Sequence, residues 1–379
     1  MSMTRPSGHG HRHFFGLIGL LLATCLLPAQ AQLRIGHPSG FTGSVAAGVK
    51  ENAEGARLYI DAVNARGGVH GQKVELISVD DGFIPARTVE LARDLITRQQ
   101  VLALFLNRGT PHAQALLPLL AEYKVPLVAP STGAMVLHQP VNPWVFNVRA
   151  TYQREAAKAI EHLATTGINR IAVLETDDSF GADSAAGARK GFEQTGLTPV
   201  LQAKFPRENP SFTDLARQVN TAAAQAVMVI GSAGNTANAV KAIRAAGSRA
   251  QVVTLSNNAS TGFIRLLGEH ARGVIVTQVF PNERRVTYPL IKEARDLATA
   301  KGMDGVSPAM MEGFAAAKVL VEGLRRAGPN PTPSDLRDAL EGLRSFDLGG
   351  LSVSYSRDSH TGLDFADLSI IDASGRFRR

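Results

Sequence analysis

The clearest prospect of binding chemistry in this chain lies in two short loops of glycine and hydroxyl-bearing residues. They are Gly109-Thr110, after the apolar residues 101–106, and Ser131-Thr132-Gly133, after the apolar residues 125–129. A helix-length stretch separates the loops, so we expect both at the carboxyl ends of neighbouring parallel strands, where open α/β sheets bind ligands. Hydroxyls beside the free N–H groups of a helix start can receive a carboxylate or another group rich in acceptors. The same hydroxyls could instead cap the helices that follow them.

Two adjacent carboxylates, Asp80 and Asp81, are a weaker candidate, for a metal ion. No histidine or further acid accompanies them in the sequence, so we expect them to cap their own loop and predict no metal site. Enzyme signatures are also missing, because the sequence contains no G-x-S-x-G, G-x-x-x-x-G-K-[ST], H-E-x-x-H or G-x-G-x-x-G pattern. We therefore predict no catalytic residue and no cofactor, and expect a binding protein rather than an enzyme.

Short β-branched apolar runs alternate with helical stretches along the chain, which predicts the α/β class, with mainly parallel sheets covered by helices on both faces. The expected strands cover residues 33–35, 74–79, 170–174, 226–230, 252–254, 273–276 and 366–371. The expected helices cover residues 49–65, 86–99, 154–166, 187–195, 212–223, 237–246 and 308–326.

The alternation pauses twice, and these pauses indicate where the chain crosses between two lobes. The extended residues 143–149 and 277–281 do not lead directly into the next turn, and we place a third crossing near residues 351–353. Three hinge crossings divide the mature chain into two discontinuous lobes. The predicted lobes are residues 32–147 plus 279–353, and residues 148–278 plus 354–379.

The first 31 residues are predicted to be a cleaved export signal. Arg5 and Arg12 form a basic start, residues 14–27 are mostly apolar, and Ala29-Gln30-Ala31 provides an A-x-A cleavage site. Because the apolar run is too short to span a bilayer, we expect cleavage after about Ala31 and a periplasmic mature protein. The alternative is lipidation of Cys25, the single cysteine, although Thr24 stands where a smaller residue is expected.

Charge and length narrow the function classes further. The formal net charge of +7 falls to +5 once the two arginines of the signal are removed (7 − 2), and this charge is spread thinly. A nucleic-acid partner is therefore not expected, because phosphate backbones need clustered basic residues. The residues that remain, about 348 (379 − 31), are too many for one compact core, which supports two lobes.

Eight short segments in a fixed order carry a family resemblance. They are Phe41-Thr42-Gly43, residues 64–71, Asp80-Asp81-Gly82, Gly109-Thr110-Pro111, Ser131-Thr132-Gly133-Ala134, residues 146–155, residues 177–181 and residues 277–281. In this order they resemble the leucine/isoleucine/valine-binding-protein-like group of solute-binding receptors of ABC transporters, over essentially the whole mature chain. The resemblance implies the type I periplasmic-binding fold, a small-molecule ligand held in a closing cleft, and delivery to an inner-membrane ABC permease. We expect a monomer.

The resemblance also implies which residues contact the ligand. In such receptors one lobe holds the ligand head group with the two hydroxyl loops, which here are Gly109, Thr110, Ser131, Thr132 and Gly133. Tyr152, at a helix start after the first crossing, would add a ring and a hydroxyl from the second lobe, or else simply pack at the junction. Phe180 matches a position that in the family presents an aromatic ring over the ligand. Alternatively, Phe180 forms a hydrophobic staple with the helix that follows it. Phe41 is a candidate third ring.

One departure from the family pattern bears on the ligand. Amino-acid receptors usually place an acid opposite the hydroxyl loops to pair with the α-ammonium, but the expected loop here reads Leu255-Ser256-Asn257-Asn258. We include Asn257 in the site. A buried ammonium without a counter-charge is costly, so we predict an aromatic or other hydrophobic carboxylate rather than a zwitterionic amino acid.

Other charged residues leave alternatives open. Arg108, Arg149 or His112 could add positive charge to the site. Glu155 or Asp178 could restore an amino-acid ligand, or could lie in the first turn of a helix, where the macrodipole favours an acid. A second functional alternative is a periplasmic sensory subunit that binds an amide or an amino acid and signals to a membrane receptor.

Overall fold

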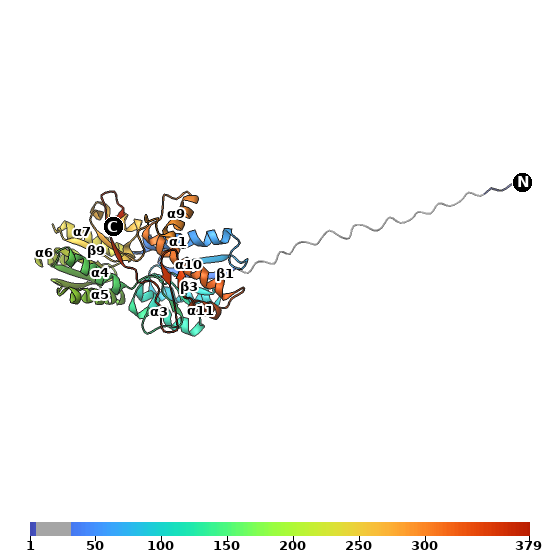
Figure 1. Cartoon of the computed structure of the whole chain (residues 1–379), viewed down its shortest axis with the longest axis horizontal. Helices are drawn as coiled ribbons and strands as arrows, with labels where there is room; N and C mark the ends of the chain where they lie inside the picture. Colours follow the sequence, from blue (N-terminus) through green and yellow to red (C-terminus); the bar gives the residue numbers. More distant parts are fainter. Residues whose placement is uncertain (5–31) are drawn as a thin grey trace.

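The chain folds into two α/β lobes, each built on one central sheet (Figure 1). The structure is a computed structural model, and it describes residues 1–4 and 32–379. The basic start, apolar run and cleavage site of the predicted signal, with Cys25, lie outside the described residues. Among the described helices, none is both long enough and apolar enough to cross a membrane. The predicted fold class, two lobes of mainly parallel sheet with helices on both faces, is confirmed.

The first lobe contains a parallel sheet in the order β2-β1-β3-β4-β5. Its strands are β1 (Leu33–Ser39), β2 (Val74–Asp80), β3 (Ala103–Phe105), β4 (Leu127–Val128) and β5 (Val145–Phe146). Its helices are α1 (Ala46–Ala65), α2 (Pro85–Thr97), α3 (Thr110–Tyr123), α9 (Pro289–Ala300), α10 (Pro308–Ala327) and α11 (Pro333–Glu341). One buried apolar cluster joins the sheet to α1, α9 and α10, and another joins its opposite face to α2 and α3.

The second lobe repeats this strand order. Its sheet runs β14-β13-β10-β9-β8-β6-β7, and the five strands from β6 to β10 are parallel. Taken from the other edge, the order β7-β6-β8-β9-β10 corresponds to β2-β1-β3-β4-β5 of the first lobe. The strands are β6 (Ile171–Thr176), β7 (Leu201–Phe205), β8 (Ala226–Ile230), β9 (Gln251–Thr254), β10 (Ile275–Gln278), β13 (Asp367–Ile371) and β14 (Phe377–Arg378). The helices are α4 (Tyr152–Thr165), α5 (Ser179–Thr195), α6 (Thr213–Thr221), α7 (Ala233–Ala245) and α8 (Thr261–Leu267). Strands β13 and β14 pair antiparallel at one edge.

The third crossing lies later in the chain than predicted. Residues near 353 belong to a small hairpin of β11 (Phe346–Asp347) and β12 (Ser352–Val353), and Tyr355 and Leu363 still pack in the core of the first lobe. The Tyr355 hydroxyl donates to the Asn147 carbonyl at 2.7 Å, which holds this segment against the first crossing. The chain reaches the second sheet only at β13.

Segments far apart in the sequence form the first lobe, because α10 lies along α1 (Figure 1). Two glycines allow the close approach of these helices. A Cβ at Gly55 would lie 1.9 Å from the Met310 carbonyl oxygen, and one at Gly313 would lie 1.9 Å from the Asn52 carbonyl oxygen. This contact brings Asn52 and Glu312 to the edge of the cleft.

We expect Gly55→Ala and Gly313→Ala each to lower the free energy of unfolding. Alanine favours a helix by about 1 kcal/mol over glycine, but an overpacked contact costs about 1–3 kcal/mol and here the clash is with rigid backbone. Urea unfolding measures the difference, with Lys50→Ala on the exposed face of α1 as the control. Equal or greater stability of both glycine variants would show that the helices are not packed this closely.

Candidate ligand-binding site

A small cavity of about 30 Å³ lies between the lobes. Its walls come from loops that follow the carboxyl ends of strands in both sheets, as expected for open α/β sheets. The lining residues are Val45, Phe83, Arg108, Gly109, Thr110, Tyr152, Thr176, Phe180, Arg207, Ser232, Asn235 and Asn257. Of the residues that the sequence analysis placed in the site, the cavity brings together Gly109, Thr110, Tyr152, Phe180 and Asn257.

The first lobe contributes the start of α3 to the cavity. Gly109 precedes this helix with φ +100°, and a Cβ there would lie 2.7 Å from His112 Nδ1, so only glycine fits well. No side chain caps the helix, which leaves its first N–H groups beside the cavity. Thr110 is buried, and its hydroxyl pairs with the Thr132 hydroxyl at 2.7 Å. Thr132 therefore orients Thr110 rather than lining the cavity itself.

The second lobe contributes two aromatic rings and an amide. The rings of Tyr152 and Phe180 meet edge to face, with centroids 4.9 Å apart. Asn257 follows β9 and donates from Nδ2 to the Gly231 carbonyl at 2.9 Å, while its buried Oδ1 has no hydrogen-bond partner within the described residues. The wall from this lobe is therefore apolar around the rings and polar elsewhere, at Asn257 and at Thr176, Arg207, Ser232 and Asn235.

Ser131 belongs to a buried polar network instead of the cavity wall. Its hydroxyl donates to Glu312 Oε1 at 2.8 Å, and it accepts from Asn52 Nδ2 at 2.9 Å and from Arg108 Nη1 at 3.1 Å. One donor and two acceptor sites are thereby used, so no hydrogen-bonding capacity of this hydroxyl remains for a ligand. Neither Ser131 nor Thr110 caps a helix, so the capping alternative does not describe these loops.

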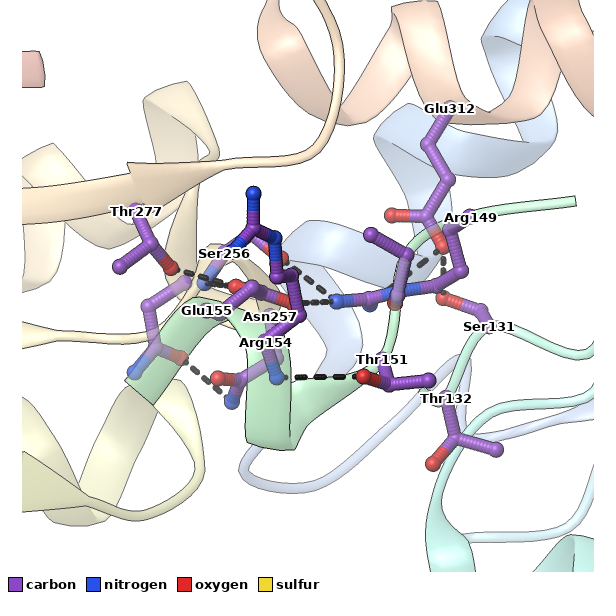
Figure 2. Close-up of polar contacts among 12 residues, drawn as sticks. Ser131, Thr132, Arg149, Thr151, Arg154, Glu155, Ser256, Asn257, Thr277 and Glu312 are labelled. Carbon is purple, nitrogen blue, oxygen red and sulfur yellow. Dashed lines mark hydrogen bonds and ion pairs between the residues drawn. The ribbon is translucent and has the colours of Figure 1, made fainter. Parts of the chain in front are cut away.

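Arg149 is the centre of this network, and it connects the two lobes (Figure 2). The side chain is buried between Glu155 of α4, which it bonds directly, and Glu312 of α10, whose Oε1 lies 3.8 Å from Nη1. It also donates to the Ser256 hydroxyl at 2.7 Å. Burial is the largest single effect and lowers the pKa of Arg149, but Glu155, Tyr152 and Glu312 together outweigh it, so the pKa is raised above its ordinary value.

The two carboxylates that could have served an amino-acid ligand both have protein partners. Glu155 is fully buried and accepts from Arg149, from the Ser256 N–H at 2.9 Å and from the Thr277 hydroxyl. Asp178 caps α5 by accepting from Phe180 N and Gly181 N, and it pairs with Arg207 at 2.5 Å.

The remaining predicted residues lie outside the cavity wall. Gly133 packs against the start of α4, where its carbonyl accepts from Tyr152 N at 2.8 Å. Phe41 packs edge-on against the buried ring of His37.

The two adjacent carboxylates cap their loop, as predicted. Asp80 accepts from Thr42 and Gly82, and Asp81 accepts from Phe83 N and the Thr88 hydroxyl.

Sequence reasoning missed Phe83 and Arg207, which both line the cavity. Phe83 follows the Asp80-Asp81-Gly82 turn, and that turn after a strand was the available signal. Arg207 follows β7, a strand that the sequence analysis did not predict because the run alternates exposed and buried positions at the sheet edge. Arg108 also lines the cavity, and it crosses the cleft to bond the Asn257 carbonyl.

The chain belongs to the periplasmic binding proteins, whose family model matches residues 32–367. A substrate-binding periplasmic protein from Ralstonia solanacearum has a similar structure, with a TM-score of 0.84 and 32% identity, covering 91% of this chain and 99% of that one. A possible leucine/isoleucine/valine-binding protein from Rhodopirellula baltica gives a TM-score of 0.86 and 25% identity, covering 93% and 98%. Leu/Ile/Val-binding protein homolog 3 of Brucella melitensis is 23% identical over 330 residues, covering 86% of this chain and 88% of the relative. These relatives are binding proteins rather than enzymes.

We expect Glu155→Gln to destabilise the protein by about 3–5 kcal/mol, because the substitution removes the direct counter-charge of a buried arginine. Chemical unfolding of the ligand-free protein measures this loss. The matched control is Asp364→Asn, which breaks the exposed Arg154–Asp364 pair at 3.6 Å and should cost less than about 1 kcal/mol. Similar small effects of both substitutions would contradict the structural role of Arg149.

His112 should make stability depend on pH. Burial lowers the pKa of His112 from 6.5 to about 4, so the folded protein holds this ring neutral while the unfolded chain protonates it. The contribution of His112 to the free energy of unfolding is therefore fully present above about pH 6.5. It falls as the pH drops toward 4, by up to about 1.4 kcal/mol per pH unit. Unfolding curves across this range should be flatter for His112→Phe and unchanged for His162→Phe, which alters an exposed ring. An equal slope in His112→Phe and the wild type would rule out this contribution.

Proposed function

We propose that this protein is the extracytoplasmic substrate-binding subunit of an ABC uptake transporter, and that its ligand is a small carboxylate with an aromatic or other apolar body. The observation that carries the ligand class is the charge of the cavity wall. Two guanidinium groups, those of Arg108 and Arg207, line the cavity, whereas none of its described lining residues is an acid. Arg207 is paired with Asp178, which does not line the cavity, so Arg108 carries the charge argument. A ligand ammonium would enter this cavity without a counter-charge.

The hydrogen-bonding groups support the same ligand class. Thr110 and the uncapped start of α3 offer donors at one end of the cavity, and Arg108 lies beside them. Charge-assisted hydrogen bonds of this kind are about twice as strong as neutral ones. The rings of Phe83, Tyr152 and Phe180 provide apolar surface for the rest of the ligand.

Binding in a cleft of this kind is coupled to closure of the lobes. Direct contacts already join them here: Arg108 bonds the Asn257 carbonyl, and Glu51 of α1 accepts from Gly262 N of α8 at 2.8 Å. A ligand that touches both lobes adds stability only to the closed form, and it shifts the equilibrium by no more than its difference in affinity for the two forms. We propose that the closed, liganded form is the one an inner-membrane permease recognises, and that the protein reaches the periplasm after cleavage near Ala31.

A matched set of probes tests the ligand class. Calorimetric titration of residues 32–379 with 3-phenylpropanoate, phenylalanine and 3-phenylpropanamide varies only the ammonium and the carboxylate. We expect the acid to bind more tightly than the amino acid and the amide, each by roughly tenfold or more, which is about 1.4 kcal/mol. The aliphatic pair, 4-methylpentanoate and leucine, should show the same order. Tighter binding of leucine or phenylalanine than of the desamino acids would reject the proposed ligand class.

Arg108→Gln should reduce the preference for acid over amide by roughly tenfold or more, because a hydrogen bond to a charged group contributes about 1.5–3 kcal/mol. The ratio of the two affinities is the decisive measurement, since a loss of lobe closure alone would weaken both ligands equally. Arg154→Gln, at a half-exposed surface arginine, is the control. A preserved acid-to-amide ratio in Arg108→Gln would remove this guanidinium from the carboxylate site.

A further inference from the structure

Phe83 stands between two hollows of the cleft. On one side is the ligand cavity, and on the other is an open groove of about 680 Å³. Phe83, Arg207 and Asn235 line both, whereas Ile84 and Glu208 line only the outer groove. The wall between the cavity and the groove is therefore made of few side chains.

The first lobe holds the Phe83 ring rigidly. The residue has φ +61°, a conformation that is uncommon for a bulky side chain and persists where the surroundings enforce it. Its N–H donates to Asp81 Oδ1 at 2.8 Å, and Asp81 is itself buried and bonded to Thr88 at 2.7 Å. The ring lies flat on His112, with centroids 4.3 Å apart and an interplanar angle of 14°.

The second lobe places Arg207 against this ring. The guanidinium carbon of Arg207 lies 4.9 Å from the centroid of Phe83, within the range of a cation–π contact. Asp178 fixes the same guanidinium through the 2.5 Å ion pair. Because Phe83 follows β2 and Arg207 follows β7, the contact forms only when the lobes are closed. We call these two residues the clasp.

We propose that the clasp of Phe83 and Arg207 is the outer wall of the ligand cavity and sets the greatest length of ligand that the closed receptor accepts. The inference rests on the proposed function, since it concerns the reach of the same carboxylate ligand. Because Phe83 and Arg207 line both the cavity and the groove, a ligand tail that points from the cavity toward the groove meets the clasp. A longer tail must then break the cation–π contact or hold the lobes apart, whereas a shorter one leaves both intact.

A series of ω-phenylalkanoates with one to six methylene groups between ring and carboxylate measures this limit by calorimetry. For the wild type we expect affinity to drop sharply beyond one length, because a single methylene too many costs roughly 10–200-fold in a closed pocket. In Phe83→Ala the drop should move to longer acids, which gain roughly tenfold, while the shortest acids weaken several-fold. Arg207→Ala should move the length limit in the same direction. This variant tests the proposal if Phe83→Ala does not fold. Ile84→Ala, which alters only the outer groove, should leave the profile of the wild type.

The outcomes separate this inference from the proposed function. If the wild type binds none of the acids, both are overturned. If it binds them and the length limit stays in place in folded Phe83→Ala and Arg207→Ala, the proposed function stands and the clasp is not the wall. A limit that moves in Ile84→Ala as well would also overturn the assignment, because it would place the limit in the outer groove.

Discussion

The structure depends on one buried cation, Arg149, held between carboxylates of both lobes. A charge removed from water costs several kcal/mol unless it is paired, so Glu155 and Glu312 cannot leave it without a large penalty. Ser131, Asn52 and Ser256 add hydrogen bonds to this cluster. Ion pairs as well as the chain itself therefore connect the lobes at the hinge. Polar side chains that are bonded in the Arg149 cluster are not available to the cavity.

The use of polar groups by the Arg149 cluster explains why the two hydroxyl loops, Gly109-Thr110 and Ser131-Thr132-Gly133, have different roles. The hydroxyl of Ser131 is fully used by the network, whereas Thr110 is oriented by Thr132 at the cavity wall. The Glu155 carboxylate stays bonded to Arg149 and is not available to a ligand, whereas Arg108 remains at the cavity wall. The specificity that we propose, for a carboxylate without an ammonium, therefore depends on how the charge of Arg149 is paired as well as on the cavity wall.

The sequence predicts those features that local patterns encode. Alternating runs indicate the α/β lobes, and the loops after β3 and β9 place Thr110 and Asn257 at strand ends. The role of Ser131 is set by Asn52 and Glu312, which are 79 and 181 positions away, so no local pattern reveals it. Arg207 was missed because β7 is an edge strand with alternating polar positions, and the later crossing depends on a contact between Tyr355 and Asn147, 208 positions apart.

A crystal structure of the protein with a bound carboxylate ligand tests the central claim most directly. The account predicts the ligand carboxylate at the start of α3 within hydrogen-bond distance of Thr110 or Arg108, its apolar body against Tyr152 and Phe180, and Glu155 still paired with Arg149. A ligand ammonium bound to Glu155 or Asp178, with Arg149 or Arg207 released from its acid, would contradict it.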